Sequence, residues 1–353
     1  IWINFGLGSN TVSVLGKKNC RRFNRLTIRF ADGCIRHFFC SYLLKKWFEL
    51  ILQHQVELAQ IMTVEQGKPL KEAKGEIIYA ASFIEWFAEE GRRMYGQTVP
   101  SEMPNKNLFT FRMPVGTALI ITAGNFPAAV PSWYIIPALL TGNSVVWKPS
   151  EYTPAVAEAM TAIFHAAGVP KDVLVTVVAE GKETFEGMVK GLDEGTINKV
   201  GFTGSTEVGR LIGAKVGEYI QSACLELGGK NPMIIMPDAD LDLALDGALF
   251  AGFGTAGQRC TSTRRLIIHE NVYEEVKSRL ASAYSKLVIG NPLDEKNHVG
   301  PLIDKDAVKA FQLMRHDHHG DAQLAADIVD PESQVACLLG VQTGGWLVQE
   351  QQL

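Results

Sequence analysis

A single cysteine, Cys260, stands in a setting that suits nucleophilic chemistry. It follows three glycines, Gly252, Gly254 and Gly257, and it lies between Arg259 and a run of hydroxyl residues. An isolated cysteine is most often a small buried apolar residue, but this loop favours an exposed thiol. The thiolate is the reactive form, and it needs nearby positive charge or a base. By itself the pattern only suggests a nucleophile.

The glycines before Cys260 also match the G-x-G-x-x-G pattern of dinucleotide-binding loops. That pattern binds a pyrophosphate only where a strand precedes it and a helix follows it. Here the preceding residues 241–250 are predicted to be helical, and a strand is expected after Cys260. The context therefore favours a tight loop that presents the next residues over a cofactor loop.

Two other stretches carry residues suited to binding and acid–base chemistry. Gly201–Gly209 follows a predicted strand and begins a predicted helix, so its backbone N–H groups could hold a phosphate. Glu226 lies among leucines and glycines, where we expect it to be buried, which would suit a general base. The alternative is that Glu226 is a helix-capping or ion-paired carboxylate.

Strands and helices alternate through the central part of the chain. Apolar runs predict buried parallel strands at Val115–Ile121, Ser144–Trp147, Val173–Val178, Lys199–Phe202 and Met233–Met236, with a further strand at Arg265–His269. Helical patterns are expected at 47–62, 69–92, 154–167, 184–189, 206–216, 241–252 and 272–287. This order predicts a doubly wound parallel α/β sheet, the Rossmann-like class, with a second α/β domain.

The domain organisation follows from where these patterns begin and end. We expect a dinucleotide-binding domain over residues 45–226 and a partial catalytic domain over 227–311. Residues 1–44 and 312–353 show no sustained period and are left unassigned. One interpretation is that both ends are translated out of frame or belong to another sequence, so that the second domain is incomplete at its C-terminal side.

Composition sets the class of protein and of partner. A chain of 353 residues suffices for about two domains, and its net charge of -4 gives no reason to expect nucleic acid. Six cysteines without regular spacing argue against a disulfide framework or a zinc site and favour a reducing, cytoplasmic setting. The uncharged stretch 113–147 contains four prolines, so we expect no membrane span there. Basic residues near the N-terminus leave a transit peptide as an alternative.

Five motifs together resemble one enzyme family. In chain order they are ITAGNFP (121–127), VVWKPSE (145–151), GFTGSTEVGR (201–210), LELGGKNP (225–232) and GTAGQRCT (254–261). Their order and approximate spacing are similar to those of the NAD(P)-dependent aldehyde dehydrogenase superfamily. The resemblance covers roughly residues 45–304, and five ordered motifs make it specific where any one would not be.

The resemblance implies a role for three residues in the chemistry. Cys260 would attack the aldehyde carbonyl to give a thiohemiacetal. Asn125 would donate its side-chain N–H to the developing oxyanion, together with the backbone N–H of Cys260. Loss of hydride would leave a thioester, and Glu226 would activate the water that hydrolyses it. Without the resemblance, Asn125 would be interpreted as a turn residue.

The resemblance also implies a cofactor site. Lys148 and Glu151 would contact the adenosine ribose, whereas Gly204 and Ser205 would contact the pyrophosphate. A carboxylate at Glu151 can accept from a free ribose 2′-hydroxyl and repels a 2′-phosphate, so NAD is favoured over NADP. Considered alone, Lys148 and Glu151 would read as a strand end followed by a solvated charged turn.

Two departures from the family pattern limit these expectations. The later Glu-x-Phe-Gly-Pro segment, which holds the nicotinamide ribose, and the C-terminal oligomerisation strand have no match after Phe311. Residues 96–114 resemble the other oligomerisation strands, and full-length relatives are homo-oligomeric. A weakly active or non-catalytic dinucleotide-binding remnant is therefore one alternative, and a CoA-acylating enzyme is another.

The substrate is indicated only by the branches of the family that particular stretches resemble. The stretch GTAGQRCT with two following arginines is similar to the branch that contains α-aminoadipic semialdehyde dehydrogenase. The stretches EQGKPLKEA and WKPSE are similar to generic and to succinic semialdehyde members. Tyr134 lies near the position expected for the carboxylate-binding arginine of the succinic semialdehyde enzymes, which weighs mildly against that substrate.

Overall fold

The chain folds into two compact units. The computed structural model describes residues 35–317 and 347–349, with side chains described for residues 41–312. The first unit holds the described residues up to Leu58 together with Lys74–Glu226, and the second holds Ala59–Ala73 together with the residues from Leu227 onward. The sequence placed residues 59–73 with the first domain. They belong to the second because, for example, the backbone N–H of Leu70 donates to the carbonyl of Pro292 at 2.9 Å.

Three helices begin the described chain. They are α2 (Ile35–Gln53), α3 (Gln55–Gln66) and α4 (Leu70–Glu90), and a single 3-10 turn, η1 (Gly91–Arg93), follows. Helix α2 starts at Ile35, within the segment 1–44 where the sequence shows no period. In the first unit Trp47 of α2 is almost fully buried and packs edge-on against Phe164, with ring centroids 4.8 Å apart.

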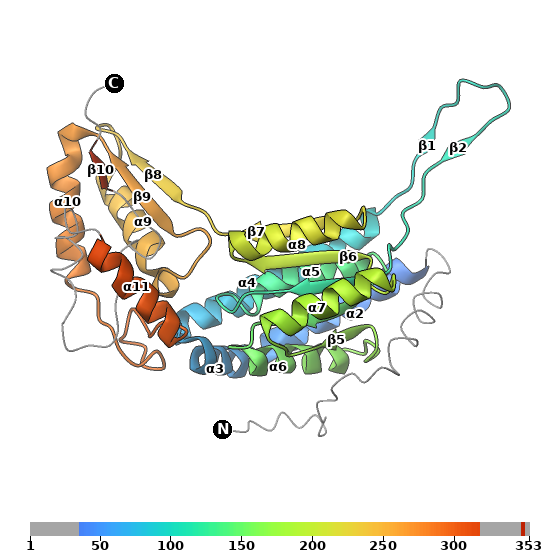
Figure 1. Cartoon of the computed structure of the whole chain (residues 1–353), viewed down its shortest axis with the longest axis horizontal. Helices are drawn as coiled ribbons and strands as arrows, with labels where there is room; N and C mark the ends of the chain where they lie inside the picture. The colour runs from blue at the N-terminus through green and yellow to red at the C-terminus, as the bar shows by residue number, and fades with distance from the viewer. Residues whose placement is uncertain (1–34, 318–346, 350–353) are drawn as a thin grey trace. The chain divides into compact units, whose positions relative to one another are not determined.

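A five-stranded sheet forms the centre of the first unit. Its strands are β3 (Thr117–Ile121), β4 (Ser144–Lys148), β5 (Leu174–Thr176), β6 (Lys199–Gly204) and β7 (Ala223–Leu227). The helices between them are α5 (Ala129–Leu140), α6 (Pro154–Ala166), α7 (Gly181–Asp193) and α8 (Thr206–Glu218). Figure 1 shows how these elements follow one another along the chain.

The strand order is β5-β4-β3-β6-β7, and the pairs β3–β4, β3–β6 and β4–β5 are parallel. All five residues of β3 are buried, as a central strand of a covered parallel sheet requires. After β3 the chain adds β4 and β5 on one side of that strand, and then β6 and β7 on the other side. The doubly wound parallel sheet predicted from the sequence is thus confirmed, and β7 is an added strand that the sequence did not predict.

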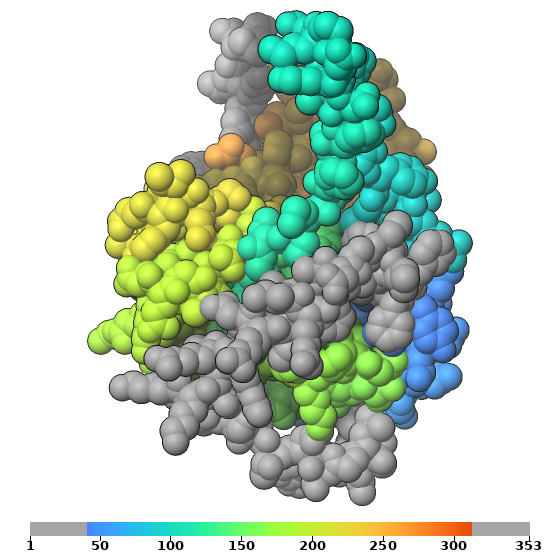
Figure 2. Space-filling view, turned by 90° about the vertical axis from the view of Figure 1, so that its right-hand side faces the viewer, coloured from blue at the N-terminus to red at the C-terminus, as the bar shows by residue number. Residues whose placement is uncertain are grey.

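A two-stranded hairpin extends from the first unit. Strand β1 (Thr98–Val99) pairs antiparallel with β2 (Leu108–Phe109). Figure 1 shows the hairpin extending beyond the helices of its own unit, and Figure 2 shows its atoms in teal. Large apolar side chains along it are exposed: Met103, Leu108, Phe109, Phe111, Met113 and Val115. All of them except Val115 lie within residues 96–114, which resemble oligomerisation strands in sequence. Contiguous exposed apolar surface is typical of a binding face.

The second unit has a smaller parallel sheet. Strand β9 (Thr263–Ile268) lies between β8 (Asn231–Ile235) and β10 (Leu347–Gln349). Besides residues 59–66 of α3 and 70–73 of α4, the unit contains helix α9 (Leu241–Phe253), the 3-10 turn η2 (Gly254–Gly257), helix α10 (Glu270–Tyr284) and helix α11 (Lys305–Asp317). Buried residues of β8, β9, α9 and α10, including Ile235, Ile268 and Val276, make the core.

Helix α11 and strand β10 correct the expectation that regular structure fails after Phe311. The helix continues to Asp317, and three residues within 312–353 join the sheet beside β9. The remainder of the two unassigned segments lies outside the described residues.

Neither a membrane helix nor a metal cluster is found in the part of the chain that the structure describes. None of its helices combines the length and apolarity needed to cross a bilayer. No three histidine, cysteine or acidic side chains among these residues are grouped so that they could hold a metal ion.

Candidate active site

The predicted cofactor residues follow the carboxyl ends of neighbouring strands in the first unit. Lys148 ends β4, Gly204 ends β6, and Asn125 comes four residues after the end of β3. Strand β3 lies between the other two, and the chain leaves it toward opposite edges of the sheet. Doubly wound sheets bind ligands at this switch in strand order, outside the carboxyl ends. The topology therefore brings these residues to the edge where a dinucleotide is expected.

Lys148 and Glu151 form an ion pair across the turn after β4. The Lys148 Nζ atom lies 2.9 Å from Glu151 Oε2, and the lysine side chain is buried while that of Glu151 is 45% exposed. Burial alone would raise the pKa of Glu151, but hydrogen bonds from Lys148 and the backbone, with the lysine charge, lower it below its ordinary value. Glu151 is thus an anion held in place, and Lys148 is not the solvated residue of a simple charged turn.

Gly204 and Ser205 form the entry to helix α8. The Ser205 hydroxyl caps the helix by accepting from the Val208 N–H at 3.3 Å. A Cβ atom on Gly204 would lie 2.5 Å from the ring of Phe202, so the backbone passes too close to that ring for a larger residue. A helix start with a glycine before it suits an anion such as a phosphate.

Asn125 lies in a loop whose far end is anchored by a buried carboxylate. Its side chain is half-buried, and its Oδ1 accepts from the Phe126 N–H at 3.1 Å. Glu76 of α4, which is 4% exposed, accepts from the N–H groups of Ala128 and Ala129 at 2.8 and 3.1 Å. These donors begin α5, where a carboxylate also stabilises the helix dipole. Glu76 thereby fixes the loop that carries Asn125.

Removing the Glu76 carboxylate should destabilise the first unit. In Glu76→Ala the two N–H groups lose a buried acceptor, which we expect to lower the free energy of unfolding by about 2–3 kcal/mol. Urea denaturation measures this change. Glu158→Ala, an exposed residue of α6, is the control and should change stability by less than about 0.5 kcal/mol. Equal effects of the two substitutions would contradict the anchoring role.

Glu226 lies in strand β7 and is exposed, which corrects the expectation that it is buried among apolar residues. Burial alternates along this strand, so Cys224 and Glu226 lie on the exposed face and their neighbours are half-buried. The sequence suggested that Glu226 is buried because its neighbours in the motif are leucines and glycines. In a strand of alternating burial, however, the residue between two leucines points to the opposite side.

Tyr134 is part of the packing of α5 on β6. Its hydroxyl lies 2.9 Å from Thr203 Oγ1 and 3.2 Å from the carbonyl oxygen of Phe202. Burial raises the pKa of Tyr134 to about 12, against the effect of the Thr203 hydrogen bond and with smaller contributions from Cys224 and Glu226. With its hydroxyl bonded inside the unit, Tyr134 has a structural role that explains its presence.

Cys260 lies in the second unit, exposed, between η2 and β9. Helix α9 runs into the glycine pattern as far as Phe253 and strand β9 follows at Thr263, so Gly252–Gly257 lacks the preceding strand and following helix of a dinucleotide loop. Thr255 and Ala256 have left-handed φ angles of 53° and 51°, and Gly257 has 72°. This tight turn is buried, and the chain emerges from it at Cys260. The structure thus supports the interpretation of the glycines as a turn that presents the thiol.

Several hydrogen bonds fix the backbone around Cys260. Asn231 Nδ2 donates to the carbonyl oxygens of Cys260 and Ser262 at 2.7 and 3.2 Å. The buried Ser262 hydroxyl donates to the Gly257 carbonyl at 3.0 Å, and Arg264 donates to the same oxygen at 2.7 Å. The pKa of Arg264 is lowered by burial. The loop is therefore held on both sides of the cysteine.

Arg259 does not act as a neighbouring charge directed at the thiol, which corrects that element of the sequence interpretation. Its guanidinium lies 2.8 Å from the carboxylate of Glu72 and 4.6 Å from the centre of the Phe250 ring. The pairing could not be read from the sequence because Glu72 and Arg259 are 187 residues apart.

The sequence missed Glu72, Glu76 and Asn231, and all three hold loops in place. Asn231 lies within the LELGGKNP motif, so its membership of a motif was a usable signal. Glu72 and Glu76 are four residues apart in a predicted amphipathic helix, a spacing equally typical of solvent-facing carboxylates.

Comparisons with known proteins decide the family. The sequence profile described as "Aldehyde dehydrogenase family" matches residues 41–332. The chain belongs to the aldehyde dehydrogenase family. The match begins and ends further out than the resemblance seen in the motifs, residues 45–304.

Similar aldehyde dehydrogenases include two bacterial semialdehyde enzymes. Glutarate-semialdehyde dehydrogenase of Pseudomonas putida is 45% identical over 77% of the chain and 56% of its own length. Succinate-semialdehyde dehydrogenase [NADP(+)] of Escherichia coli is 44% identical over 79% of the chain and 57% of its own length. The suspected family and its semialdehyde branches are thereby confirmed.

Solved structures show the same fold. The succinate-semialdehyde dehydrogenase of Burkholderia pseudomallei superposes with a TM-score of 0.82 at 37% identity, over 91% of this chain and 66% of that one. An aldehyde dehydrogenase from Brucella melitensis gives 0.81 at 38% identity, over 86% and 62%. The chain thus spans between about half and two thirds of the length of the relatives it matches.

Proposed function

We propose that this aldehyde dehydrogenase chain oxidises an aldehyde to a carboxylic acid with NAD(P), using Cys260 as the nucleophile. The observation that carries the proposal is an exposed thiol at the end of a buried, left-handed turn, held by hydrogen bonds on both sides. A nucleophile must be both accessible and positioned, and this loop provides both.

The chain's own residues would divide the chemistry among them. The Cys260 sulfur attacks the carbonyl carbon, and the Asn125 side-chain N–H and the Cys260 backbone N–H donate to the oxygen as it gains charge. The attack gives a thiohemiacetal, which becomes a thioester once its hydride and its hydroxyl proton have been lost. Glu226 would accept a proton from the water that hydrolyses this thioester. Its exposed position in β7 leaves it accessible to that water.

The residues after β4 and β6 fit a nicotinamide dinucleotide. Glu151 is a held anion that can accept from ribose hydroxyls, Lys148 is its cationic partner, and Gly204 with Ser205 supplies a helix start for the pyrophosphate. When bound, the dinucleotide would accept the hydride of the aldehyde. Lys148, Glu151, Gly204 and Ser205 would hold it.

We expect NAD to be preferred over NADP because the Glu151 anion would repel a ribose 2′-phosphate. The Escherichia coli relative is named for NADP(+), so the preference needs a direct test. Glu151→Gln should lower the Kd ratio of NADP to NAD roughly 10-fold, equivalent to about 1.4 kcal/mol. Titration calorimetry with each dinucleotide measures the ratio. Glu186→Gln in α7 should leave it unchanged, and an unchanged ratio in Glu151→Gln would overturn the assignment.

The substrate class proposed is the semialdehyde of a dicarboxylic acid. Its basis is the similarity to the glutarate and succinate semialdehyde enzymes, and the resemblance of GTAGQRCT to the α-aminoadipic branch points to the same class. The mild objection from Tyr134 loses weight because its hydroxyl is engaged within the first unit.

Turnover separates this proposal from its alternatives. The chain is mixed with NAD or NADP and a panel of aldehydes containing succinic, glutaric and α-aminoadipic semialdehydes, with absorbance of the reduced cofactor followed. Acid production supports the proposal. Dinucleotide binding without turnover would identify a remnant, and turnover that requires CoA would identify an acylating enzyme.

We further propose a small-molecule aldehyde and a second copy of the chain as its partners, in a reducing compartment such as the cytoplasm. The exposed apolar side chains of the β1–β2 hairpin are the surface for the second copy. Unpaired, exposed thiols at Cys224 and Cys260 suit a reducing environment.

A further inference from the structure

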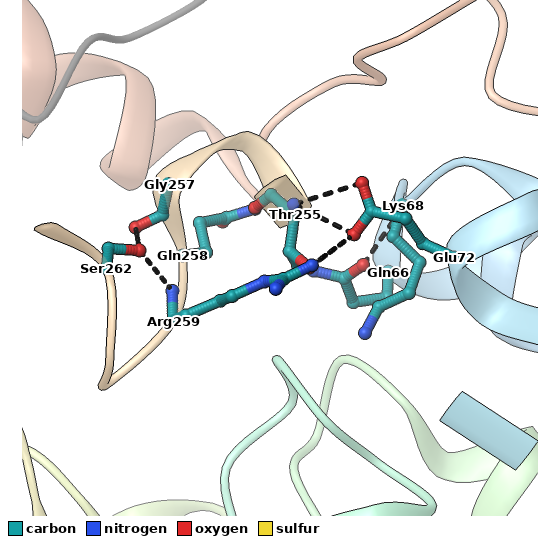
Figure 3. A network of polar contacts seen from close by, with 8 residues as sticks. All are labelled: Gln66, Lys68, Glu72, Thr255, Gly257, Gln258, Arg259 and Ser262. Carbon is teal, nitrogen blue, oxygen red and sulfur yellow. Dashed lines mark hydrogen bonds and ion pairs between the residues drawn. The ribbon is translucent and has the colours of Figure 1, made fainter. Parts of the chain in front are cut away.

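A carboxylate from helix α4 holds the turn before Cys260. Glu72, in the first turn of that helix, accepts from the backbone N–H of Thr255 at 2.9 Å and from its hydroxyl at 2.8 Å. Both residues belong to the second unit. Figure 3 shows the carboxylate beside Thr255, with the Arg259 side chain reaching it from the other end of the loop.

The turn needs such support because of its backbone. Thr255 and Ala256 are both in the left-handed region, where residues with a Cβ atom are rarely found. Such conformations persist only where surrounding contacts determine them. Thr255 is 1% exposed, so Glu72 provides its N–H with an acceptor at a place sheltered from bulk water.

The same carboxylate oxygen also binds Arg259. Its Nη2 atom lies 2.8 Å from Glu72 Oε2, and both side chains are 17% exposed. The guanidinium Nε donates to the Thr255 hydroxyl at 3.1 Å, which closes a network of three residues. In such a sheltered pair, removing one partner leaves the other charge uncompensated. Arg259 directly precedes Cys260 in the chain, so the uncompensated charge would belong to the residue adjacent to the nucleophile.

We propose that Glu72 is a positioning residue for Cys260, which fixes the left-handed turn that presents the thiol and compensates the charge of Arg259, the residue that precedes Cys260 in the chain. The inference rests on the proposed function only in taking Cys260 as the nucleophile. Glu72 itself contacts Thr255 and Arg259, and it acts on the thiol through these two residues.

The other contacts of the loop define what Glu72 adds. Asn231 and Ser262 bind it through neutral groups, and Gln258 Oε1 accepts from the Ile303 N–H at 3.2 Å. Within the second unit, Glu72, Arg259 and Arg264 are charged side chains that contact the loop, and Lys68, which is 2% exposed, lies in the same network of residues. Lys68 and Arg264 are kept in every variant of the test, so the changes in charge come from the Glu72–Arg259 pair.

Alkylation of Cys260 by iodoacetamide tests the proposal without requiring turnover. The rate is measured across pH by peptide mass spectrometry in the full chain, with the exposed Cys224 of the first unit as internal reference. In Glu72→Gln the uncompensated Arg259 cation should move the midpoint of the rate profile down by roughly 0.5 pH units or more. In Arg259→Met the uncompensated carboxylate should move it up. The double variant should return it close to the wild-type value.

Opposite signs are the decisive result, because a merely structural loss would disturb the loop in the same way in both variants. Glu275→Gln, in an exposed pair with Arg279 on α10, is the matched control and should leave the profile unchanged. Unchanged midpoints, or shifts of the same sign in the two single variants, would overturn the proposal. An altered Cys224 rate would show unfolding, in which case Glu72→Asp, which keeps the charge, must restore the wild-type profile or the proposal fails.

Turnover provides a second, separate readout. We expect Glu72→Gln to lower kcat/KM by about 10- to 100-fold, mainly through kcat, since a small misplacement of a nucleophile has effects of this order. An inactive wild-type chain would contradict the proposed function and leave the alkylation result standing. Full activity in Glu72→Gln would contradict the positioning role and leave the proposed function standing.

Discussion

Replacing Cys260 with serine should lower aldehyde oxidation by more than about 10³-fold, because removing a catalytic nucleophile removes the covalent route altogether. Cys260 is exposed, so the substitution costs no core packing, and dinucleotide binding in the first unit should be retained. Formation of reduced cofactor from a semialdehyde, followed by absorbance, gives the rate.

The second exposed thiol provides the control for that experiment. Cys224→Ser removes a thiol in strand β7 that is also exposed. The rate of aldehyde oxidation should then stay within a factor of about two of the wild type. Substantial residual turnover in Cys260→Ser, or loss of turnover in Cys224→Ser, would contradict the assignment of the nucleophile.

Glu226→Gln should separate the two halves of the reaction. The amide cannot accept a proton from water, so we expect kcat to fall by about 10²–10⁴-fold, the usual contribution of a general base. Acylation of Cys260 does not use Glu226 in this scheme. A rapid first turnover should therefore remain, with slow release of acid afterwards.

Pre-steady-state absorbance measures this prediction directly. A burst of reduced cofactor close to one per active chain, followed by a slow phase, is the expected result. Glu274→Gln on α10, an exposed carboxylate of the second unit, should show wild-type turnover. Unchanged acid production by Glu226→Gln would remove Glu226 from the mechanism.

Local patterns predicted the fold well because its sheet is built from short, separate signals. The run Thr117–Ile121 is apolar and bounded by Gly116 and Gly124, and Pro154 begins α6 where a proline is tolerated. The alternation of these elements fixes the doubly wound order almost without reference to distant residues. Strand β7 was not predicted because a segment of five residues followed by two glycines resembles a loop in sequence.

For the candidate site, the sequence offers a set of residues whose roles stay a prediction, and it does not give their surroundings. The motifs pointed to Cys260, Glu226 and Asn125 by residue type and order. A motif does not show, however, that Glu226 lies on the exposed face of a strand. Contacts such as Glu72 with Arg259 depend on the tertiary fold, and nothing in either local stretch announces them. What the sequence lacked was therefore the positioning network around the chemistry.

The central claim is that Cys260 carries the substrate as a thioester, and the Glu226→Gln chain offers the most direct measurement. The chain is mixed with NAD and a semialdehyde, quenched in acid within the burst, digested and analysed by mass spectrometry. The peptide containing Cys260 should gain the mass of the aldehyde less two hydrogens, at close to one adduct per active chain. An unmodified Cys260 peptide despite formation of reduced cofactor, or an adduct on Cys224 instead, would contradict the account.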